Sequence, residues 1–236
     1  MIGKRRRRYS RKPARQAMRV VALLLAASRA PAQTATNSLP LTTSNDPIVT
    51  TNEPDGRTWS FLASAYTYIV PDDREYVQPT FTADRGWLHL EARYNYEGLD
   101  TGSAWIGYNF SLGEKLSLEF TPMLGGVFGD TTGVAPGYRY TLSWWKLELY
   151  SEGEYVFDTG DSSESFFYTW SELSLAPVDW FRFGLVVQRT KLYETDFDIQ
   201  RGFLIGLSYK KVDFTTYVFN PDASRPTIVL GLGVRF

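Results

Sequence analysis

The chain ends with the stretch PTIVLGLGVRF (Pro226–Phe236), in which large apolar side chains alternate with other residues. One face carries Ile228, Leu230, Leu232, Val234 and Phe236, and the other carries Thr227, Gly231, Gly233 and Arg235. This period of two predicts a β-strand that reaches the last residue. The final residues of a soluble domain usually fray, and a terminal aromatic there has little to pack against. We therefore expect the aromatic end of this chain to be held in a sheet.

The closing strand resembles that of Gram-negative outer-membrane β-barrel proteins, which typically ends in Phe and is read by the membrane assembly machinery. The resemblance implies an all-β fold, an antiparallel up-and-down transmembrane β-barrel in the bacterial outer membrane. It also implies an assembly signal that includes Phe236, Val234 and Leu232, with the barrel assembly machinery as a partner. The resemblance is to the porin-like class over residues 58–236 and points to no single family.

The start of the chain has the features of an export signal. A short apolar run, Val20 to Ala27, follows basic residues, and Ala30-Pro31-Ala32 matches the small-residue pattern of a cleavage site. We predict a signal peptide over 1–32, with Met18 as a possible true start. Residues 33–57 are rich in Thr, Asn, Ser and Pro, which predicts a flexible periplasmic tail before the barrel at 58–236.

The charge of the chain changes once this leader is set aside. Ten of the 25 basic residues precede position 33, whereas all 26 acidic residues follow it. The remainder has 15 basic against 26 acidic residues, a net charge of −11. An acidic chain argues against nucleic acid as a partner. No stretch after residue 32 has the ~18–20 apolar residues of a membrane-spanning helix, so a membrane crossing requires strands.

From Arg57 onward, segments of alternating polarity are separated by turn residues. Most approach the ~9–11 residues that a tilted strand needs to cross a membrane, and we count about twelve, an even number as in bacterial barrels. Pro79 fits least well, because proline cannot donate to a ladder. The predicted strands are 60–70, 76–83, 87–97, 103–112, 115–124, 134–144, 145–158, 166–176, 180–190, 201–209, 212–220 and 226–236.

The predicted linkers form two alternating sets. Those at 84–85, 113–114, 144–145, 177–179 and 210–211 are very short. The others, PDDRE, GLDT, GDTTG, TGDSSES, TDFD and NPDASR, are longer and mostly acidic. Short periplasmic turns and longer outer loops are typical of outer-membrane barrels, and an even strand count places both termini in the periplasm.

Alternation alone does not decide which face meets lipid, and a soluble β-sandwich or barrel is the other interpretation. The leader, the linker asymmetry, the terminal Phe and aromatic residues near strand ends together favour a membrane barrel with the charged rows inside. The aromatic belts are then expected from the outward-facing residues Tyr94, Tyr96, Tyr108, Phe110, Tyr155, Phe157, Phe167, Phe181, Phe183 and Tyr209.

A barrel of about twelve strands lies between a filled lumen at ~8 strands and an open channel at ~16. Strand parity predicts a lining that includes His89, Glu91, Arg93, Trp105, Asn109, Glu119, Arg139, Glu148, Glu152, Glu172, Arg182, Asp213 and Arg235. The same parity adds Asn95, Tyr150, Glu154, Trp170, Gln188, Gln200 and Tyr217. Acidic residues outnumber arginines, so we predict a narrow diffusion channel for small polar or cationic solutes. The alternative is a closed structural or interaction barrel whose lumen is filled by ion pairs.

A second alternative is an outer-membrane lipid hydrolase that uses Ser111, His89 and Glu91. It requires that two strands pair around the GLDT loop so that the histidine faces the serine. Parity places this group in the lumen, away from acyl chains, and a hydrogen-bonding lumenal histidine is the simpler interpretation. No cofactor is expected; with no cysteine and one histidine, a multi-histidine metal site is excluded.

A basic group is predicted on the lipid side near the outer rim. Arg189, Lys191 and Arg201 fall on the outward face of two strands joined by the TDFD loop. Cross-strand neighbours of one sign repel unless an anion lies between them, and lipopolysaccharide phosphates fit that role. Ordinary snorkelling of long side chains to the interface is the alternative.

Overall fold

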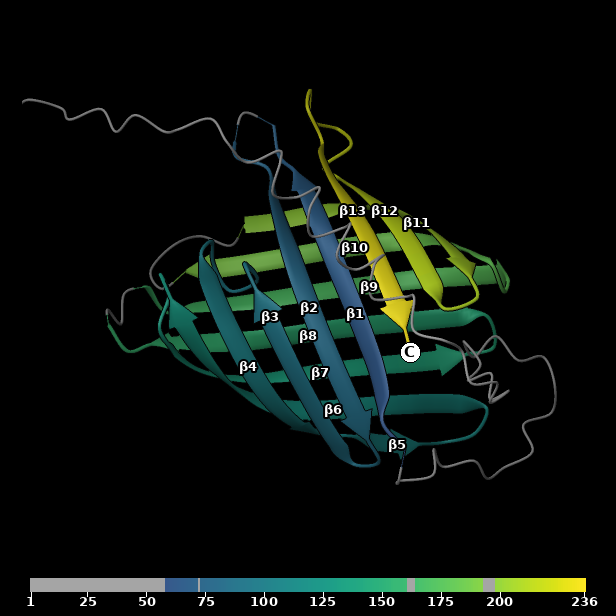
Figure 1. Ribbon diagram of the computed structural model, residues 1–236. Coiled ribbons are helices and arrows are strands. Elements are labelled where there is room, and N and C mark those ends of the chain that lie inside the picture. The colour runs from purple at the N-terminus through teal and green to yellow at the C-terminus, as the bar shows by residue number, and fades with distance from the viewer. Residues whose placement is uncertain (1–57, 72, 161–163, 193–197) are drawn as a thin grey trace, which may run out of the picture. The chain divides into compact units, whose positions relative to one another are not determined.

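The computed structural model describes residues 58–71, 73–160, 164–192 and 198–236 (Figure 1). The predicted signal peptide and tail, and most of the TDFD loop, lie outside the described residues. The strands are β1 (Ser60–Ile69), β2 (Tyr76–Arg85), β3 (Leu88–Tyr94), β4 (Thr101–Tyr108), β5 (Phe110–Leu112), β6 (Leu116–Gly129), β7 (Gly133–Trp144), β8 (Leu147–Asp158), β9 (Phe166–Val178), β10 (Phe181–Leu192), β11 (Asp198–Tyr209), β12 (Val212–Phe219) and β13 (Thr227–Arg235).

The strands form one closed antiparallel sheet. β4 and β5 both pair with β6, and the register is continuous across the break at Asn109, so the two segments make a single barrel strand. The barrel therefore has twelve strands, as predicted. β2 pairs with β1 across Pro79 but with β3 only from Thr80 onward, so the ladder beside β3 begins after the proline.

The terminal phenylalanine closes the barrel. β1 pairs with β13, and beyond the last strand residue Phe61 and Phe236 exchange backbone hydrogen bonds of 3.0 and 3.1 Å. Their rings stack with centroids 6.2 Å apart. The last residue thus both extends the ladder and packs on its neighbour, which explains why the chain can end on an aromatic side chain.

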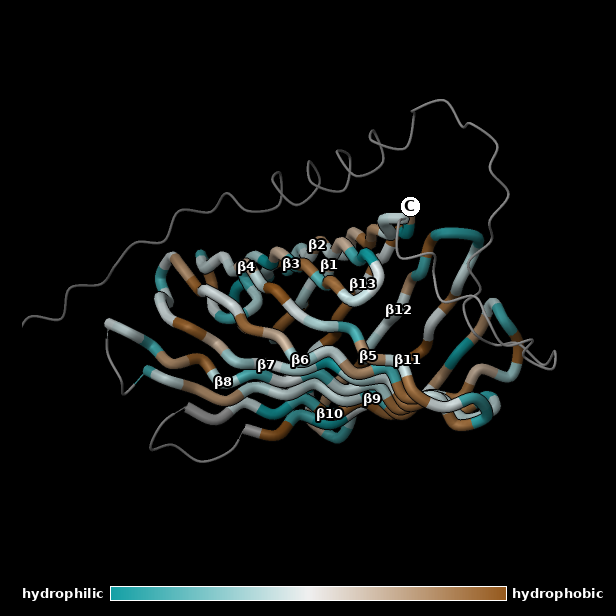
Figure 2. Tube along the Cα trace, turned by 90° about the horizontal axis from the view of Figure 1, so that it is seen from below, coloured by the Kyte–Doolittle hydropathy of each residue, from teal (hydrophilic) through white to brown (hydrophobic). Residues whose placement is uncertain are grey.

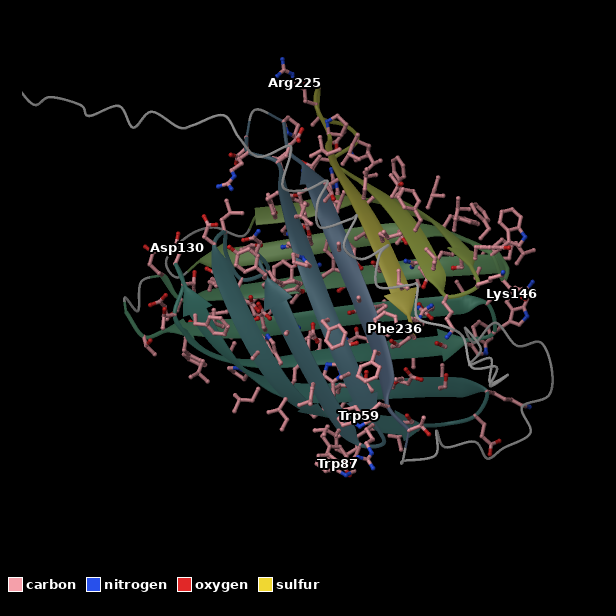
Figure 3. All side chains as sticks on the ribbon, viewed as in Figure 1. Trp59, Trp87, Asp130, Lys146, Arg225 and Phe236 are labelled. Carbon is pink, nitrogen blue, oxygen red and sulfur yellow. The ribbon has the colours of Figure 1, made fainter. Side chains whose placement is uncertain are left out.

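Short and long connections lie at opposite ends of the barrel, as the linker lengths predict. Two-residue turns join Arg85 to Leu88, Trp144 to Leu147 and Tyr209 to Val212. The first turn residue has a positive φ in each case, which suits the twist of a tight hairpin. Figure 3 shows Trp59, Trp87 and Lys146 at the edges of the barrel away from Asp130 and Arg225.

The distribution of burial is the reverse of that in a soluble protein. Large apolar side chains point outward and are exposed in mid-strand, including Ile106, Leu124 and Leu185, with 62% of Leu185 exposed. Charged side chains on the inner face are buried, including Arg93 and Glu154 at 6% and 4%. Hydropathy alternates accordingly along the strands (Figure 2). The apolar exterior is the surface that a lipid bilayer covers, because apolar area of this extent is unfavourable in water.

Tryptophans gather at the end with the short turns. Trp59, Trp87, Trp144, Trp145 and Trp180 are all exposed there. Such rings favour the boundary between hydrocarbon and water, so they mark one edge of the apolar band. No helix in the described part of the chain is long and apolar enough to span a membrane.

Candidate functional site: the barrel lumen

Residues directly opposite each other in a ladder share a face, so the register fixes the lumen side. Glu91 lies opposite Trp105, and Arg139 lies opposite Glu152. Every second residue of a strand shares a face, so counting from these inward-facing pairs places the predicted lining residues that lie on strands on the inner face. Asn95 follows the end of β3 and is not part of this pattern.

Arg93 forms the centre of a buried ionic cluster that joins opposite walls of the barrel. Its Nε donates to Glu91 Oε1 at 2.7 Å, and its Nη1 donates to Glu154 Oε2 at 2.7 Å. The same Nη1 lies 3.6 Å from Glu97 Oε1. Figure 1 shows β3, which carries Arg93, in front of β8, which carries Glu154. The interaction therefore crosses the lumen and narrows it.

A second arginine extends this cluster. Arg139 Nη2 donates to Glu91 Oε2 at 2.9 Å and lies 3.5 Å from Glu152 Oε2. The hydroxyls of Tyr96 and Tyr150 donate to the same Glu152 carboxylate at 2.5 and 2.6 Å. Charge-assisted hydrogen bonds of this kind hold side chains in fixed positions. The carboxylates of the cluster outnumber its two guanidinium groups.

Aromatic and aliphatic side chains fill another part of the lumen. Trp170 and Tyr217 meet edge to face with centroids 5.0 Å apart, and Tyr66 on β1 contacts both rings. Glu172 Oε1 accepts from the Trp170 indole and the Tyr217 hydroxyl, both at 2.8 Å. This aromatic cluster comprises Tyr68, Tyr168, Trp170, Val186, Leu204, Tyr217, Phe219 and Val229, with Tyr66, Val70, Tyr76, Tyr96, Tyr150 and Phe166 packed against it.

The polar side chains of the lumen are more exposed at the end with the short turns. Arg235 pairs with Asp213 at 2.5 Å, and 47% of the arginine side chain is exposed. Glu119 is exposed and Glu148 is half-buried on the same inner face. Arg182 donates to Glu172 at 2.8 Å and to Thr215 at 3.1 Å, which links this polar entrance to the aromatic cluster.

Tyr96 does not lie in the outer aromatic belt, contrary to the sequence prediction. Asn95 has a φ of 58°, and its N–H bonds to the Thr101 carbonyl at 2.8 Å. This turn ends the alternation of β3 and directs Tyr96 inward, where its ring packs against Tyr168. The following residue, Glu97, is also buried in the lumen, and no simple sequence signal marks it. The other predicted belt residues on strands have outward register positions.

The geometry required for the lipid hydrolase is not present. His89 lies opposite Gly107, whereas Ser111 pairs with Glu119 on β6. The two ring nitrogens of His89 instead form hydrogen bonds with carboxylates. Nδ1 lies 2.7 Å from Asp84 Oδ1, and Nε2 lies 3.0 Å from Glu91 Oε2. The prediction that the histidine faces the serine was wrong because the turn at Asn95 sets a different register. The three residues therefore do not form a catalytic group.

The basic group near the outer rim is spread over two strands. Arg189 lies opposite Ile199, and Arg201 lies opposite Val187, so the two arginines are diagonal neighbours on the outward face. Arg201 also lies 3.5 Å from the exposed carboxylate of Asp222. The side chain of Lys191 lies outside the described residues.

No protein-family model and no curated protein matches this chain. Among solved structures, "KdgM porin" aligns with a TM-score of 0.53 and 11% identity, over 74% of this chain and 98% of that one. "KdgM porin in complex with disordered oligogalacturonate" aligns with a TM-score of 0.52 and 13% identity, over 75% of this chain and 98% of that one. OccK5 (OpdH) of Pseudomonas aeruginosa gives a TM-score of 0.41 and 9% identity, over 76% and 67%. At these identities the likeness to the two KdgM structures concerns the fold alone, and the predicted antiparallel up-and-down β-barrel is confirmed.

Proposed function

We propose that the chain forms a narrow channel in the bacterial outer membrane for small polar solutes, with a preference for cations over anions. The main support is a closed barrel with an apolar exterior and an inner face on which carboxylates outnumber arginines. Fields inside a narrow, low-dielectric lumen act strongly on permeant ions. Among the described residues, the inner carboxylates are Asp84, Glu91, Glu97, Glu119, Glu148, Glu152, Glu154, Glu172 and Asp213, and the inner arginines are Arg93, Arg139, Arg182 and Arg235.

Cation preference is tested by the reversal potential of the refolded protein in a planar bilayer under a salt gradient. We expect the sign of the reversal potential to show that cations carry most of the current. Its magnitude should fall after Glu119→Gln and Glu148→Gln, which remove negative charge near the entrance. Glu75→Gln, on an exposed loop outside the lumen, is the matched control and is expected to leave the value unchanged. A reversal potential of the opposite sign in the unmodified protein contradicts the proposal.

The charge of the lumen also bears on the class of solute. One of the structures with this fold is a complex with oligogalacturonate, which is an acidic oligosaccharide. A polyanion of that kind is repelled by a lumen in which carboxylates are in excess, because like charges interact strongly where water is scarce. Neutral polar molecules and small cations suit this lumen better.

The aromatic cluster is expected to limit conduction. Trp170 and Tyr217 are buried inside the lumen, so Trp170→Ala with Tyr217→Ala removes two large rings from the path. We expect single-channel conductance to rise about twofold or more, since pore width governs passage. Trp145→Ala, which removes an exposed ring from a turn outside the lumen, serves as the control.

A closed barrel is the second candidate function, because Arg93 bridges opposite walls and is almost fully buried. Under this alternative the lumenal ion pairs fill and rigidify the structure, and the protein acts as a scaffold or an interaction partner in the membrane. Absence of current both in the unmodified protein and in the Trp170, Tyr217 double variant supports the closed barrel over the channel.

The proposal includes two binding partners of the barrel, the assembly machinery and lipopolysaccharide. We propose that the barrel assembly machinery reads the closing strand through Leu232, Val234 and Phe236. We also propose that Arg189, Lys191 and Arg201 contact lipopolysaccharide phosphates at the outer rim. The ion pair between Arg201 and Asp222 competes with such a phosphate, so the contribution of Arg189 is expected to be the larger one.

A further inference from the structure

The β3–β4 loop, residues Asn95 to Asp100, folds into the barrel and is held there by polar contacts. Asn95 and Asp100 both have positive φ, at 58° and 56°, and Asp100 N donates to Asn95 Oδ1 at 2.8 Å. Between these two residues, Tyr96 and Glu97 extend toward the lumen. Tyr96 reaches Glu152 on β8, so the loop makes contact with the opposite wall.

Glu97 is buried, and only one of its two carboxylate oxygens accepts hydrogen bonds. Oε1 accepts from the Ser103 hydroxyl at 2.6 Å and lies 3.3 Å from the Trp105 indole nitrogen. Oε2 is buried and has no hydrogen-bond partner. A buried carboxylate oxygen without a donor is unfavourable, because it has lost its hydration without gaining a hydrogen bond.

Glu154 shows the same pattern beside it. Its Oε2 accepts from Arg93 Nη1, but its Oε1 is buried without a partner. Because Glu97 Oε1 lies near the same Arg93 nitrogen, the two carboxyl groups are side by side. One guanidinium nitrogen thus serves two carboxylates, and each has an oxygen that lacks a donor. A proton on one carboxyl group supplies the missing donor and removes the like-charge repulsion.

We propose that Glu97 and Glu154 form a buried proton-binding site, and that a proton held there keeps the β3–β4 loop inside the lumen. Its effect on conduction rests on the proposed channel function, whereas the proton site itself does not. The charged and titratable groups that face the site are Glu91 and Arg93 on β3, Arg139 on β7, Glu152 and Glu154 on β8, Tyr168 on β9 and Tyr96 in the loop itself.

The direction of the pH response follows from the difference in burial of Glu97 between the inward and outward positions of the loop. Burial raises the pKa of Glu97 above its ordinary value, with Arg93 opposing this effect. A loop that leaves the lumen exposes Glu97 to water and returns its pKa toward that ordinary value. The inward loop therefore binds the proton more tightly and is favoured as pH falls. As pH rises through the raised pKa, the inward position loses this stabilisation and the lumen widens.

The test compares the refolded protein with Glu97→Gln, which keeps the shape of the protonated side chain. We expect the unmodified protein to conduct about fivefold less near pH 5 than near pH 8, and Glu97→Gln to conduct weakly at both. Glu75→Gln, an exposed loop carboxylate, is the matched control and should retain the pH response. A pH response that persists unchanged in Glu97→Gln overturns the proposal.

A second readout does not depend on conduction. The chain has no cysteine, so Val127→Cys introduces one thiol at a buried position opposite Ser103. The rate of its modification by a water-soluble thiol reagent is measured with and without Glu97→Gln, so that the pH dependence of the thiol cancels in the ratio. We expect the ratio to rise about threefold or more between pH 5 and pH 8. A rise without any current supports the proton site while rejecting the channel, and a constant ratio rejects the proton site.

Discussion

Replacing Arg93 with methionine is expected to lower the free energy of unfolding by about 3–5 kcal/mol, the largest stability effect of any single change considered. The substitution retains an unbranched side chain but removes the cation that lies between three carboxylates. Glu154 and Glu97 then remain in the lumen without a guanidinium group, while Glu91 keeps Arg139. Buried charges without a partner are strongly unfavourable because they have lost their hydration. Denaturant unfolding in detergent micelles, followed by tryptophan fluorescence, measures the change.

The matched control is Arg235→Met. Arg235 also forms an ion pair, with Asp213, but nearly half of its side chain is exposed at the polar entrance. An exposed pair contributes about 0–1 kcal/mol, so this variant should unfold almost as the unmodified protein does. Adding Glu154→Gln to Arg93→Met is expected to recover part of the loss, since it neutralises one of the unpaired carboxylates. Equal effects for Arg93→Met and Arg235→Met contradict the role given to the buried cluster.

Leu185→Arg is expected to lower the stability of the membrane-inserted barrel by about 2–4 kcal/mol, because it places a charge on the lipid-facing surface. Leu185 points outward from β10 with 62% of its surface exposed, and it pairs with Leu173 of β9 and Phe203 of β11. In a soluble protein, an exposed site of this kind tolerates substitution within about 0.5 kcal/mol. The two interpretations therefore predict clearly different results for one variant.

The depth of the substitution supplies the control for this experiment. Tyr209→Arg changes an exposed outward residue next to the turn at Lys210, where the apolar band ends. A charge near the interface is expected to reduce stability by only ~0–1 kcal/mol. Equilibrium folding into lipid vesicles gives both values. A Leu185→Arg variant that is as stable as Tyr209→Arg contradicts the lipid-facing assignment of this surface.

Much of the fold was predictable because the signal repeats along the chain. The period of two and the spacing of turn residues identified twelve strands, and the parity of each strand depends only on local alternation. The closing strand is the clearest example, since the alternation through Val234 and Phe236 leads directly to the pairing with β1. Strand ends were less accurate: β6 continues to Gly129, five residues past the predicted end at Leu124.

The contents of the lumen were less predictable, because they depend on contacts between strands that are distant in sequence. Arg93 and Glu154 are 61 residues apart, and parity says only that both face inward. Tyr96 was assigned to the wrong face because one residue with positive φ, Asn95, ends the alternation before it. The pairing of His89 with Gly107 rather than Ser111 follows from the same turn. A single backbone conformation thus decided both of these features of the site.

The central claim is that the apolar rows contact hydrocarbon while the ionic rows enclose the lumen. The most direct test is to purify the chain without residues 1–32 and to compare its folding in plain buffer with that in detergent or lipid vesicles. We predict that the native β-structure forms only where detergent or lipid is present, and that the polypeptide aggregates or remains unfolded in buffer alone. A monodisperse, natively folded protein in buffer without detergent would contradict the account.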